Sequence, residues 1–198
     1  MKRIFIAVRI IPEQKLLEVF SSFKNILAKD SVKWTEISNI HLTLEFLGDT
    51  DDDKITVLSA MLKEKCSSFA YFSFNLKGSG IFKSIRDPRT IWMGVDLSER
   101  LQDLRQNIQT GLADAGFKTG DKPFSPHLTL GRIRYLRTPD SLMKVLEMYK
   151  DTFIQTVGVN EVILYQSILK PSGPLYIPLG IFPLTHPSLS TQFLQYKG

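Results

Sequence analysis

His41-Leu42-Thr43-Leu44 and His127-Leu128-Thr129-Leu130 are two copies of one tetrapeptide, one in each half of the chain. Polar and apolar residues alternate in both copies, a pattern typical of a strand that is buried on one face. The chain has only 3 histidines, and two of them begin these copies. Because internal self-similarity indicates a repeated structural unit, the sequence predicts two related units that bring both histidines to one cleft.

The segments around the repeat read as strands and helices in alternation. Amphipathic or capped stretches predict helices at about residues 13–28, from about 49, at 98–115 and from 138. Strands are expected at about residues 4–10, 32–36, 39–47, 69–82, 90–95, from 127, at 153–169 and at 175–181, with a charged loop at 83–89. This order predicts an α+β fold with two similar lobes, each a sheet backed by helices.

Composition sets limits on the class of protein. The chain has 198 residues, of which 43% are hydrophobic and 23% charged, as in an ordinary globular domain. The net charge of +5 suits a phosphate-rich ligand, although many basic surfaces are simply solvated. Cys66 is the only cysteine, so neither an internal disulfide nor a cysteine-based zinc site is expected. No signal peptide or membrane span is predicted, and the expected location is the cytoplasm.

Side chains of the first copy are expected to alternate between a cleft and a core, because residues two apart on a strand share a face. His41 and Thr43 then lie in phase with Glu45, whereas Phe46 points into the core with the leucines. The second copy has Gly131 where the first has Glu45. This difference argues against a central catalytic role for Glu45.

Two histidines without a metal suit phosphoryl transfer, because one imidazole can take a proton from water while the other protonates the leaving oxygen. The hydroxyls of Thr43 and Thr129 can bind the non-bridging phosphate oxygens, and Arg132 can supply positive charge. Strict alternation directs Arg132 away from His127, so this role requires a bulge at Gly131. The alternative for Arg132 is a solvated arginine at a strand end.

Other chemistries have weaker support. The sequence has no Gly-x-Ser-x-Gly motif of a serine hydrolase. A zinc site would need a third ligand, and His186 lies in a region rich in Pro and Ser where a surface position is expected. The acidic run Asp51–Asp53 sits where a helix begins, so it is interpreted as favouring the helix dipole rather than as a metal site.

Further segments resemble a known family, the 2H phosphoesterases, which are named for paired His-x-Thr/Ser-x motifs. The similarity is to the LigT-like branch of RNA 2′,3′-cyclic phosphodiesterases, once called 2′-5′ RNA ligases. It covers about residues 1–182. The matching segments, two of which contain the His motifs, are Arg3–Val8, His41–Gly48, Thr90–Val95, Phe124–Arg132, Leu164–Leu169 and Gly173–Tyr176.

The resemblance implies two pseudo-symmetric lobes, each an antiparallel sheet backed by helices, around a central cleft. It implies metal-independent hydrolysis of a 2′,3′-cyclic phosphate on RNA or a nucleotide to a 2′-phosphate, with no cofactor. His41 would be the proton donor and His127 the proton acceptor, and Thr43, Thr129 and Arg132 would bind the phosphate. The expected partners are RNA ends or nucleotides, and the expected state is a monomer.

Aromatic residues near the second motif have two interpretations. Phe124 is a candidate for stacking on a base, which is the usual way to hold an unpaired nucleotide, but a core position is an equal alternative. Trp92 is expected in the core. We expect one bilobal domain over residues 1–182 and a tail over 183–198. The apolar residues that follow Ile181 would pack on the body or on a partner. They are Phe182, Leu184, Leu189, Phe193 and Leu194.

Three function classes remain open at this point. The first is the hydrolase, with reversible 2′-5′ RNA ligation as a secondary activity, since it is the same chemistry in reverse. The second is a non-catalytic module that binds RNA ends or nucleotides. The third is a structural domain whose repeat records duplication alone, and geometry tests it, because two catalytic imidazoles must reach one phosphate.

Overall fold

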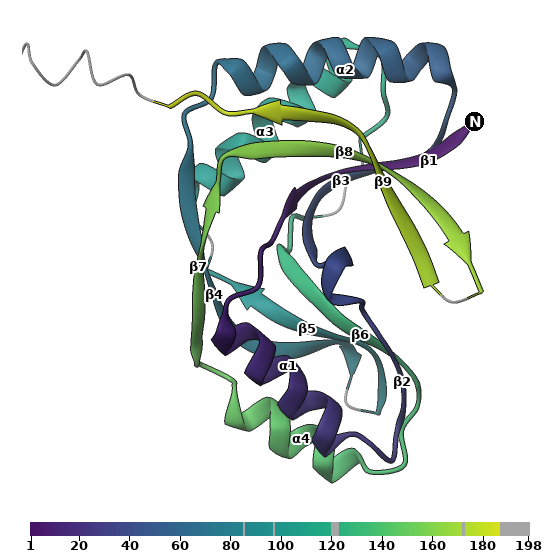
Figure 1. Ribbon diagram of the computed structural model, residues 1–198, viewed down its shortest axis with the longest axis vertical. Helices are drawn as coiled ribbons and strands as arrows, with labels where there is room; N and C mark the ends of the chain where they lie inside the picture. Colours follow the sequence, from purple (N-terminus) through teal and green to yellow (C-terminus); the bar gives the residue numbers. More distant parts are fainter. Residues whose placement is uncertain (85, 97, 120–122, 172, 187–198) are drawn as a thin grey trace, which may run out of the picture.

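The computed structural model, which describes residues 1–84, 86–96, 98–119, 123–171 and 173–186, contains one strongly curled antiparallel sheet backed by helices (Figure 1). Eight of its nine strands run in the order β7-β4-β5-β6-β3-β1-β8-β9, and the ninth, β2, pairs with β6. Figure 1 shows helices at both ends of the molecule. The prediction of an α+β fold with two helix-backed lobes is confirmed, and the two lobes share a continuous sheet.

The first lobe carries the first His motif. Its strands come from both ends of the chain, and its two helices pack against each other. The elements of the first lobe are β1 (Lys2–Arg9), β3 (His41–Thr50), β8 (Glu161–Lys170), β9 (Gly173–Pro183), α2 (Asp52–Ser67) and α3 (Glu99–Asp114).

The second lobe carries the second His motif, and its helices pack together at the other end of the molecule (Figure 1). A short 3-10 helix, η1 (Ile37–Asn39), leads from this lobe back to β3. The elements of the second lobe are β2 (Ser31–Trp34), β4 (Phe72–Ser84), β5 (Asp87–Val95), β6 (His127–Tyr135), β7 (Phe153–Val159), α1 (Gln14–Ile26) and α4 (Pro139–Met148).

The helices form where the sequence pattern predicts them. In α1 the buried residues Leu16, Val19, Phe20 and Phe23 recur at helical spacing, so one face packs on the sheet. Helix α3 begins after Ser98, whose hydroxyl accepts the backbone N–H of Leu101 at 3.2 Å. Such a cap satisfies one of the N–H groups that have no partner within the helix.

Two segments differ from the sequence expectation or extend it. Much of the charged stretch 83–89 is strand rather than loop, because β4 runs to Ser84, β5 begins at Asp87 and these two residues pair. Near the C-terminal end of the described residues, Phe182 and Leu184 are buried, and the backbone N–H of Leu184 donates to Asn160 O at 2.8 Å. The apolar residues expected at 189, 193 and 194 lie outside the described residues.

Candidate active site

The two His motifs lie on neighbouring strands at the centre of the sheet. Strands β3 and β6 are antiparallel and meet at a single register pair, Leu42 with Leu128. The four leucines of the motifs are buried, whereas both histidines and both threonines are half-buried on the opposite face. The lobes are therefore joined at β3 and β6, and His41 and His127 lie on the same face of the sheet there.

A bulge follows the second motif. Strand β5 pairs with Thr129 and with Gly131 but passes over Leu130, and Leu130 and Gly131 are both buried. The extra residue changes the alternation, so Arg132 emerges on the same face as His127. The bulge that the role of Arg132 requires is present.

The first motif has an equivalent bulge, which overturns the expected positions of the next two residues. Strand β1 pairs with Thr43 and with Glu45 but passes over Leu44. As a result Glu45 is buried, with 8% of its surface exposed, while Phe46 is 63% exposed on the cleft side. Uninterrupted alternation predicted the reverse and was wrong, because the inserted residue shifts the phase by one.

Each catalytic candidate is held by a backbone carbonyl two residues earlier. His41 Nδ1 lies 2.7 Å from Asn39 O, and His127 Nδ1 lies 2.8 Å from Ser125 O. A carbonyl can only accept, so Nδ1 carries the proton in both rings and Nε2 is left free to accept or donate. Asn39 is itself fixed, since its side-chain Nδ2 donates to Pro174 O at 2.9 Å.

Aromatic rings flank both imidazoles. Phe5 and Tyr176 approach His41 with centroids 4.9 and 5.1 Å away, and Tyr176 meets it edge-on. On the other lobe, Phe82 meets His127 edge-on at 4.5 Å. These contacts restrict ring rotation and reduce the access of water to one side of each ring.

One cavity contains both imidazoles. It opens between the two His strands, the segment that follows β2, and the start of β9. The cavity is lined by Lys33, Trp34, Thr35, Glu36, Asn39, His41, Thr43, Phe46, His127, Thr129, Arg132, Gly173, Pro174 and Tyr176. Five of the six residues that the sequence analysis selected therefore meet in one place.

Burial and nearby positive charge set the protonation of the two rings. Burial lowers the pKa of His41, a backbone hydrogen bond from the ring to Asn39 opposes this, and the charge on His127 lowers it further. Burial also lowers the pKa of His127, with the Ser125 carbonyl opposing and Arg132 adding to the effect. Both rings are therefore mainly neutral at pH 7, and a bound anion would favour protonation of one of them.

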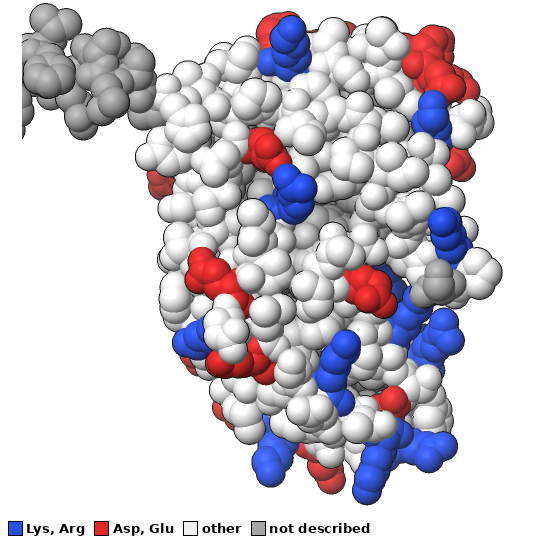
Figure 2. All heavy atoms as spheres, viewed as in Figure 1, with Lys and Arg blue, Asp and Glu red and all other residues white. Residues whose placement is uncertain are grey.

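The electrostatic character of the cavity suits an anion. Lys33 and Arg132 line it, against a single carboxylate from Glu36. In Figure 2, Lys and Arg side chains gather at the lower right, over the end of the molecule where β2 and β6 lie in Figure 1. Among the described residues there is no group of three or more His, Cys, Asp or Glu side chains that could hold a metal ion.

Phe124 is not brought to the cavity. Its partly buried ring packs on the core and faces the Arg105 guanidinium, whose carbon lies 4.7 Å from the ring centroid. Stacking of Phe124 on a base is therefore not supported, because the ring is already covered from the helix side. Trp92 also differs from its expected core position: it is half-buried, pairs with Thr129 on the neighbouring strand and contacts Phe82.

Three aromatic residues of the cavity were missed as site residues: Trp34, Phe46 and Tyr176. Tyr176 had a signal, since it ends one of the segments shared with the 2H phosphoesterases. Phe46 was hidden by the bulge, and Trp34 reaches the site only because β2 pairs with β6. A repeat-based comparison would have aligned Phe46 with Arg132, two positions after the last residue of each motif.

The chain belongs to the 2′-5′ RNA ligase superfamily, whose family model matches residues 30–168. A Thermotoga maritima protein named RNA 2′,3′-cyclic phosphodiesterase is 38% identical over 72% of this chain and 74% of its own length. A protein of the same name from Archaeoglobus fulgidus is 32% identical over 91% of this chain and 99% of its own. The family-model match includes both His motifs.

Solved structures share the fold. A Thermus thermophilus protein superimposes with a TM-score of 0.75 at 24% identity, covering 92% of this chain and 97% of that protein. The crystal structure of E. coli LigT complexed with 3′-AMP has a TM-score of 0.70 at 25% identity, over 93% of this chain and 98% of LigT. In the residues that the structure describes, no helix is long and apolar enough to cross a membrane.

Proposed function

We propose that this protein hydrolyses a 2′,3′-cyclic phosphate at the end of an RNA or on a nucleotide and leaves a 2′-phosphate. The observation that carries the proposal is the matched geometry of His41 and His127, which share one cavity and each have Nδ1 tied to a backbone carbonyl. The names of the relatives, RNA 2′,3′-cyclic phosphodiesterases, support the same reaction.

The reaction needs one proton acceptor and one proton donor. His127 Nε2 takes a proton from water as the water oxygen bonds to phosphorus, and the bond from phosphorus to the 3′ oxygen breaks. His41, protonated on Nε2 as well as Nδ1, gives its proton to that leaving oxygen. Thr43, Thr129 and Arg132 hold the non-bridging oxygens, where negative charge accumulates.

The test is incubation of the protein, with EDTA, on a short RNA that ends in a 2′,3′-cyclic phosphate, followed by identification of the phosphomonoester. A 2′-phosphate formed at an undiminished rate with chelator supports the proposal. Reversible loss of activity with EDTA would contradict a metal-free mechanism. Binding of the RNA end without turnover would favour the alternative, a non-catalytic RNA-end or nucleotide-binding module.

Ligation is a secondary proposal. When a hydroxyl of a second RNA replaces water, His127 takes the proton from that hydroxyl and His41 again protonates the leaving 3′ oxygen, so the same site can form a 2′-5′ bond. The two histidines exchange roles only when that bond is cleaved to the cyclic phosphate. Three expectations from the sequence remain predictions: a cytoplasmic location, a monomeric state and a domain boundary at residue 182. Sedimentation of the purified chain would test the monomeric state.

The pH profile should reflect the lowered pKa of both rings. Because His41 must be protonated and His127 neutral, kcat/KM is expected to be bell-shaped, with its maximum on the acid side of about 6.5, the ordinary histidine pKa. Above the higher of the two apparent pKa values, kcat/KM should fall by about tenfold per pH unit. These apparent values describe the coupled pair of His41 and His127 rather than either ring alone. The optimum of kcat should lie at higher pH, since a bound phosphate anion favours the protonated donor. A kcat/KM maximum above about pH 7.5 would contradict this assignment.

Phe46 is expected to bind the nucleoside rather than act in the chemistry. It is exposed beside the phosphate-binding residues, where an aromatic ring can stack on a base, and such stacking contributes about 1–3 kcal/mol per base. Phe46→Ala should therefore raise KM by about fivefold to 100-fold with little change in kcat. Tyr135→Ala, which removes another exposed aromatic ring from outside the cavity, is the control. Equal effects of the two variants would contradict a base-binding role.

A further inference from the structure

The two bulges next to the His motifs each present a carbonyl that needs a partner, and the two lobes supply different partners. In the second lobe, Leu130 O accepts the backbone N–H of Thr35, just after β2, at 2.8 Å. In the first lobe, the equivalent Leu44 O accepts Nε of Arg105, on helix α3, at 3.3 Å. Arg105 therefore supplies the hydrogen-bond donor for the bulge carbonyl of β3, as the backbone after β2 does for the bulge carbonyl of β6.

The residue that follows each motif, Gly131 in one lobe and Glu45 in the other, agrees with these different hydrogen-bond donors. At Gly131 an added Cβ would lie 2.8 Å from a Val32 methyl and 2.9 Å from the Trp34 ring, so β2 requires glycine there. The first motif has Glu45 at this position, and none of the described strands pairs with β3 on that side beyond Leu42. The side chain of Glu45 instead extends to α3.

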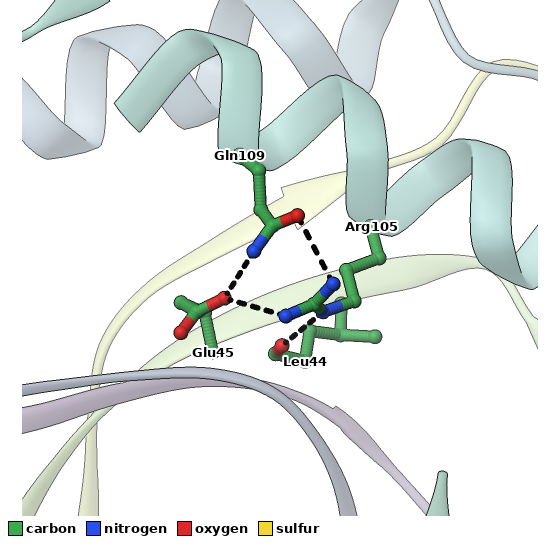
Figure 3. A network of polar contacts seen from close by, with 4 residues as sticks. All are labelled: Leu44, Glu45, Arg105 and Gln109. Carbon is green, nitrogen blue, oxygen red and sulfur yellow. Dashed lines mark hydrogen bonds and ion pairs between the residues drawn. The ribbon is translucent and has the colours of Figure 1, made fainter. Parts of the chain in front are cut away.

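Arg105, Glu45 and Gln109 form a closed network behind the first motif (Figure 3). Arg105 Nη2 lies 3.3 Å from Glu45 Oε2, which also accepts from Gln109 Nε2 at 3.0 Å. Arg105 Nη1 donates to Gln109 Oε1 at 3.0 Å. The side chains of Arg105 and Glu45 are 16% and 8% exposed, so each charge depends on the other.

The same guanidinium also contacts the segment that precedes the second motif. Its N–H groups bond to Leu44, Glu45 and Gln109, and its flat face covers the ring of Phe124, with the guanidinium carbon 4.7 Å from the ring centroid. Phe124 immediately precedes Ser125, whose carbonyl accepts His127 Nδ1–H. One side chain therefore contacts both the strand that carries His41 and Thr43 and the segment that orients His127.

We propose that Arg105 is a positioning residue that fixes the two His motifs relative to each other from the helix side of the sheet. It does not line the cavity, so it acts through Leu44, Glu45 and Phe124 rather than on the substrate. The inference rests on the proposed phosphodiesterase function for its kinetic test. It also explains why Glu45 follows the first motif although it takes no part in the proton transfers.

The test is the double variant Glu45→Met/Arg105→Met, which removes both buried charges together. Removing one partner would leave an uncompensated charge, whereas apolar replacement of a whole pair is often nearly neutral for stability. We expect a folded protein with a modestly lower Tm, because Leu44 O and Gln109 lose their partners. KM should stay within about threefold, and kcat should fall by about tenfold to 100-fold, because small displacements of reacting groups are costly.

Arg100→Met is the matched control. Arg100 also lies on α3, donates to a backbone carbonyl (Ala70 O, 3.2 Å) and covers a phenylalanine ring (Phe69, 4.3 Å), but it lies outside the cavity and away from both motifs. Its kcat per folded molecule should equal that of the wild type. If the double variant loses no more kcat than Arg100→Met, the proposal is wrong.

A second measurement does not depend on turnover. Nitrogen-15 NMR of the imidazoles above their pKa values should show the proton on Nδ1 of both His41 and His127 in the wild type. In the double variant His127 should lose this preference, while His41 should keep it because Asn39 is held by Pro174. An unchanged His127 would overturn the proposal, even if the wild type had no activity on cyclic phosphates and the proposed function had therefore failed.

Discussion

Alanine at His41 or at His127 is expected to lower kcat on a 2′,3′-cyclic phosphate RNA end by about 10²- to 10⁴-fold, the usual contribution of a general acid or base. Affinity for the RNA end should change little, because these groups act mainly in the transition state. Both rings are half-buried and each hydrogen-bonds to a carbonyl two residues away, so the fold should survive their removal. Single-turnover rates, equilibrium binding and Tm measure the three quantities separately.

His186→Ala is the control for these variants. His186 is exposed, stacks on Tyr71 with centroids 4.7 Å apart and does not line the cavity. Its replacement should leave kcat unchanged. Equal loss of folding in the His41 and His127 variants would indicate structural histidines and would favour the third class, in which the repeat records duplication alone.

A modified substrate separates the donor from the acceptor. When sulfur replaces the 3′ oxygen of the cyclic phosphate, the leaving group is a thiolate, which needs no proton because a thiol has a pKa of about 8.5. His41→Ala should then regain most of its rate, whereas His127→Ala should stay inactive because water still has to lose a proton. The opposite pattern would exchange the two assignments.

Simple periodicity predicted the parts of this fold that obey it. The repeat identified His41, Thr43, His127 and Thr129 because strand alternation holds within each tetrapeptide. It failed just beyond the first motif, at Glu45 and Phe46, since nothing local marks the bulge there. Glycine at 131 marked the second bulge, and there the prediction of Arg132 beside His127 was correct.

Long-range pairing explains the remaining errors. Trp34 joins the cavity because β2 pairs with β6, which is distant in the sequence, and Tyr176 because β9 closes the first lobe. Phe124 does not line the cavity, and its ring is covered by Arg105 from α3. Residues that come together through the sheet rather than through their own strand cannot be placed by periodicity.

Arg132 is the cation whose loss should be most costly after the histidines. Through the bulge it shares the cavity with Thr129 and His127, where a guanidinium can stabilise charge on the non-bridging oxygens. Arg132→Met should lower kcat/KM by about 10²- to 10³-fold, as when one preorganised transition-state donor is removed. Arg132→Lys should recover only part of this, because an ammonium lacks the planar pair of donors.

The charge of Arg132 also predicts a shift that distinguishes its role from simple binding. Since Arg132 helps to lower the pKa of His127, the Met variant should have a higher His127 pKa, and the acid limb of its residual pH profile should move to higher pH. Arg134→Met is the control, because Arg134 is exposed on the same strand but lines a separate groove. If Arg134→Met lowered kcat/KM as much, general attraction of RNA would explain the effect, and contact of Arg132 with the reacting phosphate would be contradicted.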